Sequence, residues 1–156
     1  MDKLGWTPLH EAAKNGELLK YKSIIENVDN KNPTDDFGTT PLHLAATNGH
    51  LDVCQIIIEN VEEKNPKANN GLTPLHQAAM NGHLDICKLI IENVEDANPE
   101  TNEGLTPFHL AAIKGCWDVC ELITEKGFDH DSAKIGELLK CKPIIENAEG
   151  KTPTNN

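Results

Sequence analysis

Histidine is the residue type in this chain whose spacing first suggests chemistry. Four histidines recur at a constant stride of 33 residues. Imidazole rings bind zinc and transfer protons, but a zinc site holds its ligands about 2.0–2.1 Å from one ion. One histidine per structural unit would place successive rings about 10 Å apart, the usual packing distance between helices. Instead of a metal or catalytic role, we predict hydrogen bonds within and between units for these rings, which are His10, His43, His76 and His109.

The cysteines are a second set of candidate ligands. The chain has five of them, an odd number, and Cys54, Cys87 and Cys120 share the 33-residue stride. One position repeated in successive units favours packed, reduced thiols in a cytoplasmic or otherwise intracellular protein over disulfides. Cys116 and Cys120 lie four residues apart and could share a ligand. No matching pair of Cys or His lies nearby in the sequence, so we predict a structural role for both.

The sequence also lacks the common motifs of catalysis and nucleotide binding. It contains no Gly-x-x-x-x-Gly-Lys loop, no Gly-x-Ser-x-Gly elbow and no His-Glu-x-x-His. No acid, base and nucleophile converge in the sequence. We therefore predict a protein that is not an enzyme and that binds neither a cofactor nor a metal.

Charge and hydropathy narrow the class of partner. The formal net charge of −11 argues against nucleic acid, which needs a basic patch. No apolar run approaches the ~20 residues of a membrane span, and the first residues lack the apolar stretch of a secretory signal. The charge would favour a basic partner if it steers association, or it keeps the chain soluble. A docking ridge and a solvated face remain the two accounts of the carboxylates of Glu26, Glu59, Glu62, Glu63, Glu92, Glu95 and Asp96.

A four-residue motif organises the whole chain. Thr-Pro-Leu-His begins at residues 7, 40 and 73, and Thr-Pro-Phe-His begins at residue 106. A fixed stride of this length indicates stacked structural units. In each unit, the threonine is expected to cap a first helix and the proline to fit its first turn. After a break at a glycine such as Gly49, a second, more apolar helix is expected to begin, near Leu51 in the second unit.

The ends of these helices carry two further expectations. His50 and His83 follow the glycines that break each unit, and we expect them to form hydrogen bonds in those loops. Asparagine tolerates the left-handed conformation better than valine does. We therefore expect the second helices to be closed by Asn27, Asn60 and Asn93.

The repeated pattern resembles the ankyrin repeat family. Gly-x-Thr-Pro-Leu-His-x-Ala-Ala, Gly-His-Leu-Asp-Val-Cys and Ile-Ile-Glu-Asn follow one another at a period of 33 over roughly residues 2–130. The resemblance implies an all-α solenoid of helix-turn-helix repeats with β-turn or hairpin tips. Its tips and first helices would line a concave face. We expect four repeats within residues 1–130, at about 2–34, 35–67, 68–100 and 101–130.

The two ends of the array depart from the repeat. Lys20 and Ser23 stand where inner units have apolar residues, which predicts a polar cap on the first unit. Near the other end, residues 135–147 echo residues 15–27 at an offset of 120, where four full repeats would give 132. We interpret residues 131–156 as a degenerate half-repeat with a loose tail, which either covers the fourth repeat or frays.

Positions that differ between the repeats indicate where a partner would bind. The resemblance implies contacts from the tips, from the residue after the tip glycine, and from two residues after Ala-Ala. An apolar subset among polar neighbours, as here, suits a protein-binding surface, although tip packing would also explain some members. The positions are Trp6, Lys14, Asn15, Asp36, Phe37, Thr39, Thr47, Asn48, Asn69, Asn70, Leu72, Met80, Asn81, Asn102, Glu103, Leu105, Ile113 and Lys114.

These observations predict a protein–protein interaction module that holds a partner on its concave face. We expect a monomer, with self-association through an exposed end as the alternative. A structural fragment of a longer ankyrin array or multidomain protein is a second hypothesis. An engineered or reconstructed scaffold without a natural partner is a third, because the repeats are so alike.

Overall fold

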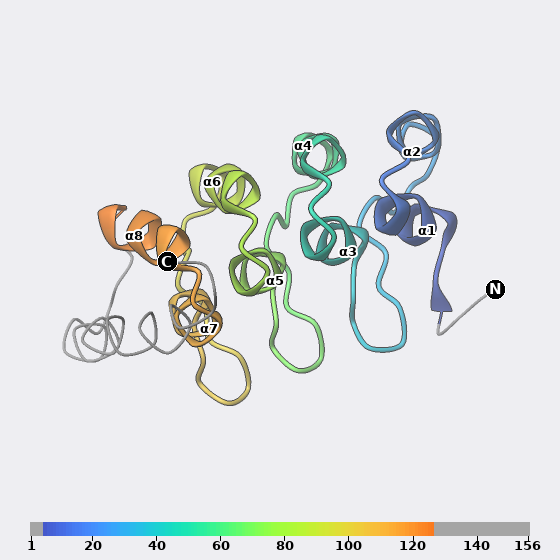
Figure 1. The fold of residues 1–156 in the computed structure, drawn as a ribbon. Helices are drawn as coiled ribbons and strands as arrows, with labels where there is room; N and C mark the ends of the chain where they lie inside the picture. Colours follow the sequence, from blue (N-terminus) through green and yellow to red (C-terminus); the bar gives the residue numbers. More distant parts are fainter. Residues whose placement is uncertain (1–4, 127–156) are drawn as a thin grey trace, which may run out of the picture.

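The computed structural model of the chain describes residues 5–126. This part holds α-helices and no strand, which confirms the predicted all-α class. The helices form pairs that stand side by side in chain order, with the first helices in one row and the second helices in another (Figure 1). The pairs, with the turns that precede them, are called units one to four. They are α1 (Pro8–Asn15) with α2 (Leu18–Ile25), α3 (Pro41–Thr47) with α4 (Leu51–Asn60), α5 (Pro74–Met80) with α6 (Leu84–Asn93), and α7 (Pro107–Lys114) with α8 (Trp117–Glu125).

Each first helix begins as its sequence predicts. In unit two, Thr40 is extended at φ −104° and its hydroxyl accepts a hydrogen bond from the His43 backbone N–H. The ring nitrogen Nδ1 of His43 accepts from the Thr40 backbone N–H at 3.0 Å in return. Pro41 occupies the first turn, where a missing N–H leaves no bond unmade. The other first helices repeat this reciprocal cap, so the motif fixes where every unit starts.

Two of the second helices end at the residues that the sequence predicts. Asn60 and Asn93 are the last residues of α4 and α6, and Val61 beyond Asn60 is extended at φ −119°. These two asparagines therefore close their helices as predicted, whereas Asn27 lies two residues beyond the end of α2. The Asn60 side-chain amide donates to the Ile56 carbonyl at 2.8 Å, which folds this side chain back along the last turn of α4. The Lys64 ammonium donates to the Val61 carbonyl, placing a cation where the helix dipole favours it.

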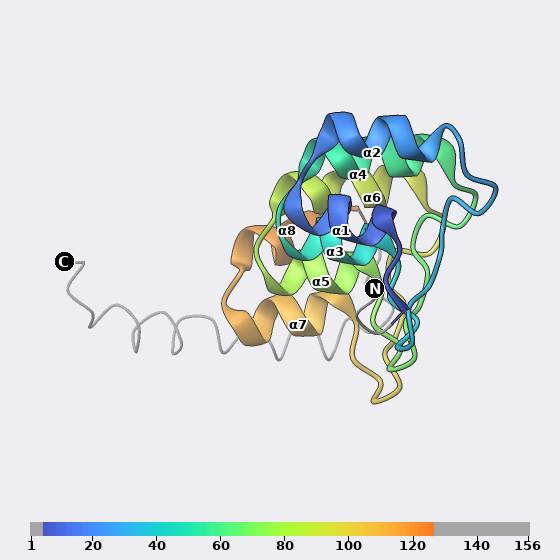
Figure 2. The same ribbon diagram turned by 90° about the vertical axis from the view of Figure 1, so that its right-hand side faces the viewer.

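The core is continuous through all units. The paired alanines of the first helices, such as Ala45 and Ala46, are fully buried, and their small size lets neighbouring first helices pack closely. Val53, Cys54 and Ile57 of α4 are also fully buried, because this helix packs against both neighbours and its own first helix. Viewed along the row, the helices lie behind one another, and the loops that lead from one pair to the next gather at one end of them (Figure 2).

Unit one closes the row with a polar face. Lys20 and Ser23 are exposed, whereas their equivalents in unit two, Val53 and Ile56, are buried and half-buried, as the sequence predicts. Leu19 beside them is 80% exposed, at the position where the other units hold the exposed Asp52, Asp85 and Asp118. At the other end, Trp117 is half-buried against the core. The half-repeat expected at 131–156 lies outside the described residues and stays a prediction.

Candidate functional site

The repeated histidines join each unit to the next. The Nε2 atom of His43 lies 2.8 Å from the carbonyl oxygen of Leu72 in unit three. His10 makes the same bond to Thr39, and His76 makes it to Leu105 at 2.9 Å. Because the backbone N–H of the capping threonine can only donate, Nδ1 accepts and Nε2 carries the proton. The predicted bonds within and between units are confirmed for these three rings.

Burial also removes these rings from acid–base chemistry. It lowers the pKa of His43 and of His76 to about 4, because the charged imidazolium loses its hydration. Both rings are therefore neutral near pH 7. Burial likewise raises the pKa of the Cys54 and Cys87 thiols to about 12, so neither is a thiolate nucleophile.

The histidine bonds hold the turns that precede the first helices, here called the tips. Tip three, residues 68–72, is closed by a 2.8 Å bond from the Ala68 N–H to the Leu72 carbonyl. Gly71 in this turn has φ +88°, which favours glycine. Neighbouring tips are bonded to each other, since the Asn69 N–H donates to the Phe37 carbonyl at 2.9 Å. The tips, which project from the row of first helices in Figure 1, are thus fixed relative to one another.

The two loop histidines hold the other end of the first helices. Nε2 of His50 lies 3.0 Å from the Lys14 carbonyl, and Nε2 of His83 lies 3.1 Å from the Thr47 carbonyl. The predicted loop hydrogen bonds are confirmed. In unit four the equivalent residue is Cys116, whose Sγ lies 4.0 Å from the Met80 carbonyl. A thiol is a weak donor, so this last connection is the weakest of the three.

One groove lies between tip three, tip four (residues 101–105) and the helices behind them. It encloses about 360 Å³ and is called the tip groove. Its apolar lining comes from Leu72, Met80, Leu105 and Leu110, and its polar lining comes from Asn70, Thr101, Asn102 and Glu103.

The tip groove brings together one third of the predicted contact positions. Six of the eighteen line it, namely Asn70, Leu72, Met80, Asn102, Glu103 and Leu105. Thr101 and Leu110 line it as well and were not predicted. The position of Leu110 holds Glu11, Leu44 and Gln77 in the other units, and this variation was a signal that could have found it.

In unit one, Trp6 and Lys14 contact each other instead of lining a groove. The Trp6 ring stacks on His10 with centroids 5.9 Å apart, and its N–H donates to Asp35 at 3.0 Å. The Lys14 ammonium lies 5.8 Å from the centre of the Trp6 ring, a cation–π contact. Trp6 therefore covers the edge of the first unit.

The other predicted positions lie on the surface outside the tip groove. Phe37 is 56% exposed and Ile113 is 60% exposed. Thr39 and Thr47 are half-buried. The remaining positions are exposed and polar: Asn15, Asp36, Asn48, Asn69, Asn81 and Lys114.

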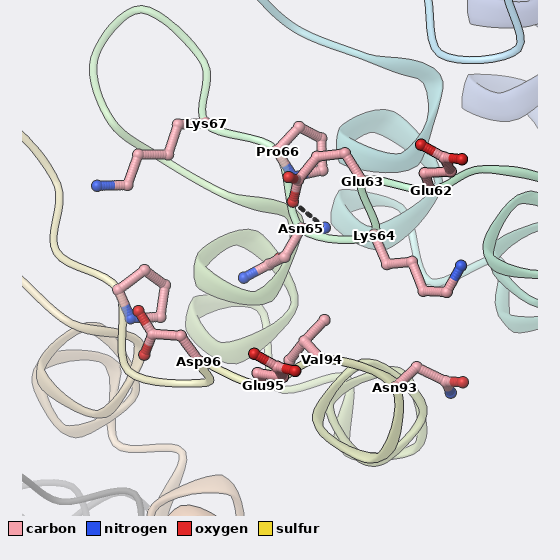
Figure 3. A pocket seen from close by; sticks show the side chains of 11 residues that line it. Glu62, Glu63, Lys64, Asn65, Pro66, Lys67, Asn93, Val94, Glu95 and Asp96 are labelled. Carbon is pink, nitrogen blue, oxygen red and sulfur yellow. Dashed lines mark hydrogen bonds between the residues drawn. The ribbon is translucent and has the colours of Figure 1, made fainter.

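A second groove, of about 640 Å³, lies between the loops after α4 and α6 and is called the loop groove. Figure 3 shows Glu62 and Glu63 on one loop, with Glu95 and Asp96 on the other. Four of the carboxylates suggested as a ridge therefore meet here, whereas the exposed Glu59 and Glu92 are not among its lining residues. The lining also includes Lys64 and Lys67, so its charge is mixed.

Two further classes of site were sought in residues 5–126. No three side chains of His, Cys, Asp or Glu come together there in an arrangement that could hold a metal ion. No helix in the same range has the length and apolar character needed to cross a membrane.

Comparison with known proteins agrees with this architecture. A family model described as ankyrin repeats in three copies matches residues 1–68 and 60–134. The comparison with curated proteins finds no match. Ankyrin repeats are generally protein–protein interaction modules and are typically not enzymes. The chain, with paired helices, capped Thr-Pro motifs and bonded tips, belongs to the ankyrin repeat family.

Proposed function

We propose that this protein binds a partner protein on the concave face formed by its tips and first helices, without catalysing a reaction. The tip groove is the observation that supports this most strongly, because six variable positions meet there around an apolar lining. Histidine bonds and tip-to-tip bonds hold those positions in place before a partner arrives. A preorganised surface loses less conformational freedom on binding.

The charge of the chain supports a protein partner over nucleic acid. The net charge of −11 repels phosphate groups and attracts basic surfaces at long range. We propose an intracellular monomer that binds neither a membrane nor a cofactor. The loop groove is the second candidate surface, since four carboxylates line it and would favour a basic partner.

Partner capture from a cell lysate tests the proposal. One bait carries Phe37, Leu72, Met80 and Ile113 all changed to Ala, and circular dichroism verifies that it is folded. The matched control bait carries Glu62, Glu63, Glu95 and Asp96 all changed to Gln. We expect a protein that the unmodified chain and the control retain and that the first bait loses.

The other outcomes of this capture contradict the proposal in distinct ways. Loss only from the control bait would move the site to the loop groove. Equal retention by all baits would place it on neither groove. No retention by any bait would favour a structural fragment of a longer array, or a scaffold without a natural partner.

A further inference from the structure

We propose that the tip groove binds one large apolar side chain of the partner together with a basic residue beside it. This inference rests on the proposed function and specifies the chemistry of the partner segment. It concerns units three and four, because the equivalent surface of the first two units is built differently.

The apolar floor of the tip groove is local. The residue before the capping threonine is Leu72 in unit three and Leu105 in unit four. In unit two the same position holds Thr39, and in unit one it holds Trp6, whose ring is already engaged by His10. Apolar side chains at this position are therefore open to a partner only at the C-terminal pair of tips.

The size of the tip groove leaves room for one large apolar side chain together with a neighbouring residue of the partner. Its volume of about 360 Å³ is at the lower end of the ~300–1,000 Å³ range of ligand pockets. Leu72, Met80, Leu105 and Leu110 would surround a leucine, methionine or phenylalanine of the partner. Removing that apolar surface from water would supply the driving force.

The rim of the tip groove selects for a hydrogen-bond donor. Glu103 is the only charged residue among the described residues that line it, and its side chain is exposed. Within residues 5–126 no ion pair or hydrogen bond occupies its carboxylate, whereas its backbone N–H donates to Thr101. The Asn102 side-chain amide donates to the Asn69 carbonyl at 2.9 Å, so its oxygen remains the available acceptor.

The donor that fits this rim is arginine or lysine. Two acceptors at the edge of an apolar floor suit a cation on a long apolar stem, and arginine offers several donors in one plane. Asn70 adds one donor, because its oxygen accepts from the Leu72 N–H and its NH₂ group is left for a carbonyl of the partner. An acidic partner segment would instead be repelled by Glu103.

Selection from a phage-displayed library of random 12-residue peptides tests this specificity. The whole chain is the target, and enriched sequences are synthesised with fluorescein for binding by fluorescence anisotropy. We expect the enriched peptides to share a Leu, Met or Phe with an Arg or Lys within two positions. Enrichment of apolar peptides without a basic residue, or of acidic peptides, would overturn the proposal.

Variants then place the bound peptide. We expect Leu105→Ala to weaken binding about tenfold, the loss that marks a residue in the centre of an interface. Leu105→Met should retain most of the affinity, which separates a binding defect from a folding defect. Glu103→Gln should weaken binding about threefold at low salt and reduce its salt dependence, since an exposed charge pair is screened by salt. Leu19→Ala changes an equally apolar but distant residue, and we expect no effect.

Two results would overturn this inference and leave the broader proposal intact. The first is unchanged peptide binding by Leu105→Ala, while the lysate partner is still lost from the bait with four alanines. The second is dimerisation of the unmodified chain in sedimentation that Leu105→Ala abolishes, which would assign the groove to a second copy.

Discussion

Units one and two share a buried framework with units three and four but present a different surface at their tips. His10 and His76 bond the next tip in the same way, at 2.8 and 2.9 Å. Above these bonds, Trp6 packs on its neighbours in unit one, whereas Leu72 and Leu105 line an open groove. The repeated motif therefore determines how the units stack, whereas the residues on the surface of the tips can vary from unit to unit.

The framework residues are constrained because their side chains form hydrogen bonds, and the surface residues are free to vary because theirs do not. The His43 ring uses both nitrogens, one within its own unit and one to the next, so another residue would leave buried groups unsatisfied. The side chains of Leu72 and Met80 make no such bonds and are only half-buried. Substitution at such positions costs little stability.

Acid should lower the free energy of unfolding through both pairs of units, one and two as well as three and four. This is the largest effect expected. The pKa of His43 and of His76 is about 4 in the folded chain, below the unfolded value of about 6.5. The unfolded state therefore takes up protons first, and the stabilisation present above pH 6.5 is lost as the pH falls towards 4. We expect a loss of about 2 kcal/mol for each ring, measured by urea unfolding between pH 7 and 4.5.

His43→Gln is the control for this pH dependence. Carboxylates also titrate in acid, so the informative quantity is the change in slope when one ring is removed. We expect the variant to bind about one proton fewer on unfolding near pH 5.5. An unchanged slope would show that the ring does not resist protonation.

Removal of one framework histidine should cost the same in either half. His43→Ala and His76→Ala each leave a threonine N–H and a carbonyl of the next tip without a partner. We expect each to lower the free energy of unfolding by about 3 kcal/mol, from unsatisfied groups and a small cavity. Losses that differ by more than about 1 kcal/mol between the two would contradict a common framework.

Three substitutions should build a second copy of the tip groove one unit earlier, between tips two and three. Thr39, Thr47 and Gln77 occupy the positions of Leu72, Met80 and Leu110 one unit earlier, and Leu72 already stands where Leu105 would. We expect Thr39→Leu, Thr47→Met and Gln77→Leu together to add a second, weaker site for the selected peptide. Calorimetry should show the stoichiometry rise from one to two. The control variant, with Thr39→Ser and Thr47→Ser, should keep one site. A single site in both variants would contradict the claim that these apolar residues make the difference between the units.

Unit four should gain stability when its thiol is replaced by the imidazole of its neighbours. Cys116 lies 4.0 Å from the Met80 carbonyl, whereas the His83 ring lies 3.1 Å from the Thr47 carbonyl. We expect Cys116→His to raise the free energy of unfolding by about 1 kcal/mol, the usual worth of one hydrogen bond. Thermal unfolding followed by circular dichroism would detect it. A lower melting temperature would mean that the space beside Gly82 cannot hold the ring.

Much of the framework could be predicted from the sequence because it follows from a strict period. The caps at Thr40 and the bonds of His43 and His50 require only that one residue type return every 33 positions. The way in which α4 ends could not be predicted from conformational preference alone, since the Asn60 side chain bonds back to the Ile56 carbonyl and Val61 beyond it is extended.

The candidate site was predicted less completely, for a geometric reason. The tip groove joins a residue of one tip to residues of the next tip and of the helices behind them, so its members come from two units. Counting variable positions within a unit found Leu72 and Met80 but missed Thr101 and Leu110. It also included Trp6 and Lys14, which engage each other, because a sequence does not show which side chains meet.

Hydrogen–deuterium exchange of the whole chain, with and without the selected peptide, tests the central claim most directly. The backbone amides of tips three and four, residues 68–72 and 101–105, can be compared with those of tip two, residues 35–39, in one experiment. We expect bound peptide to slow exchange in tips three and four and to leave tip two unchanged. Slower exchange confined to residues 61–67 and 94–99 around the loop groove, or to unit one, would contradict the account.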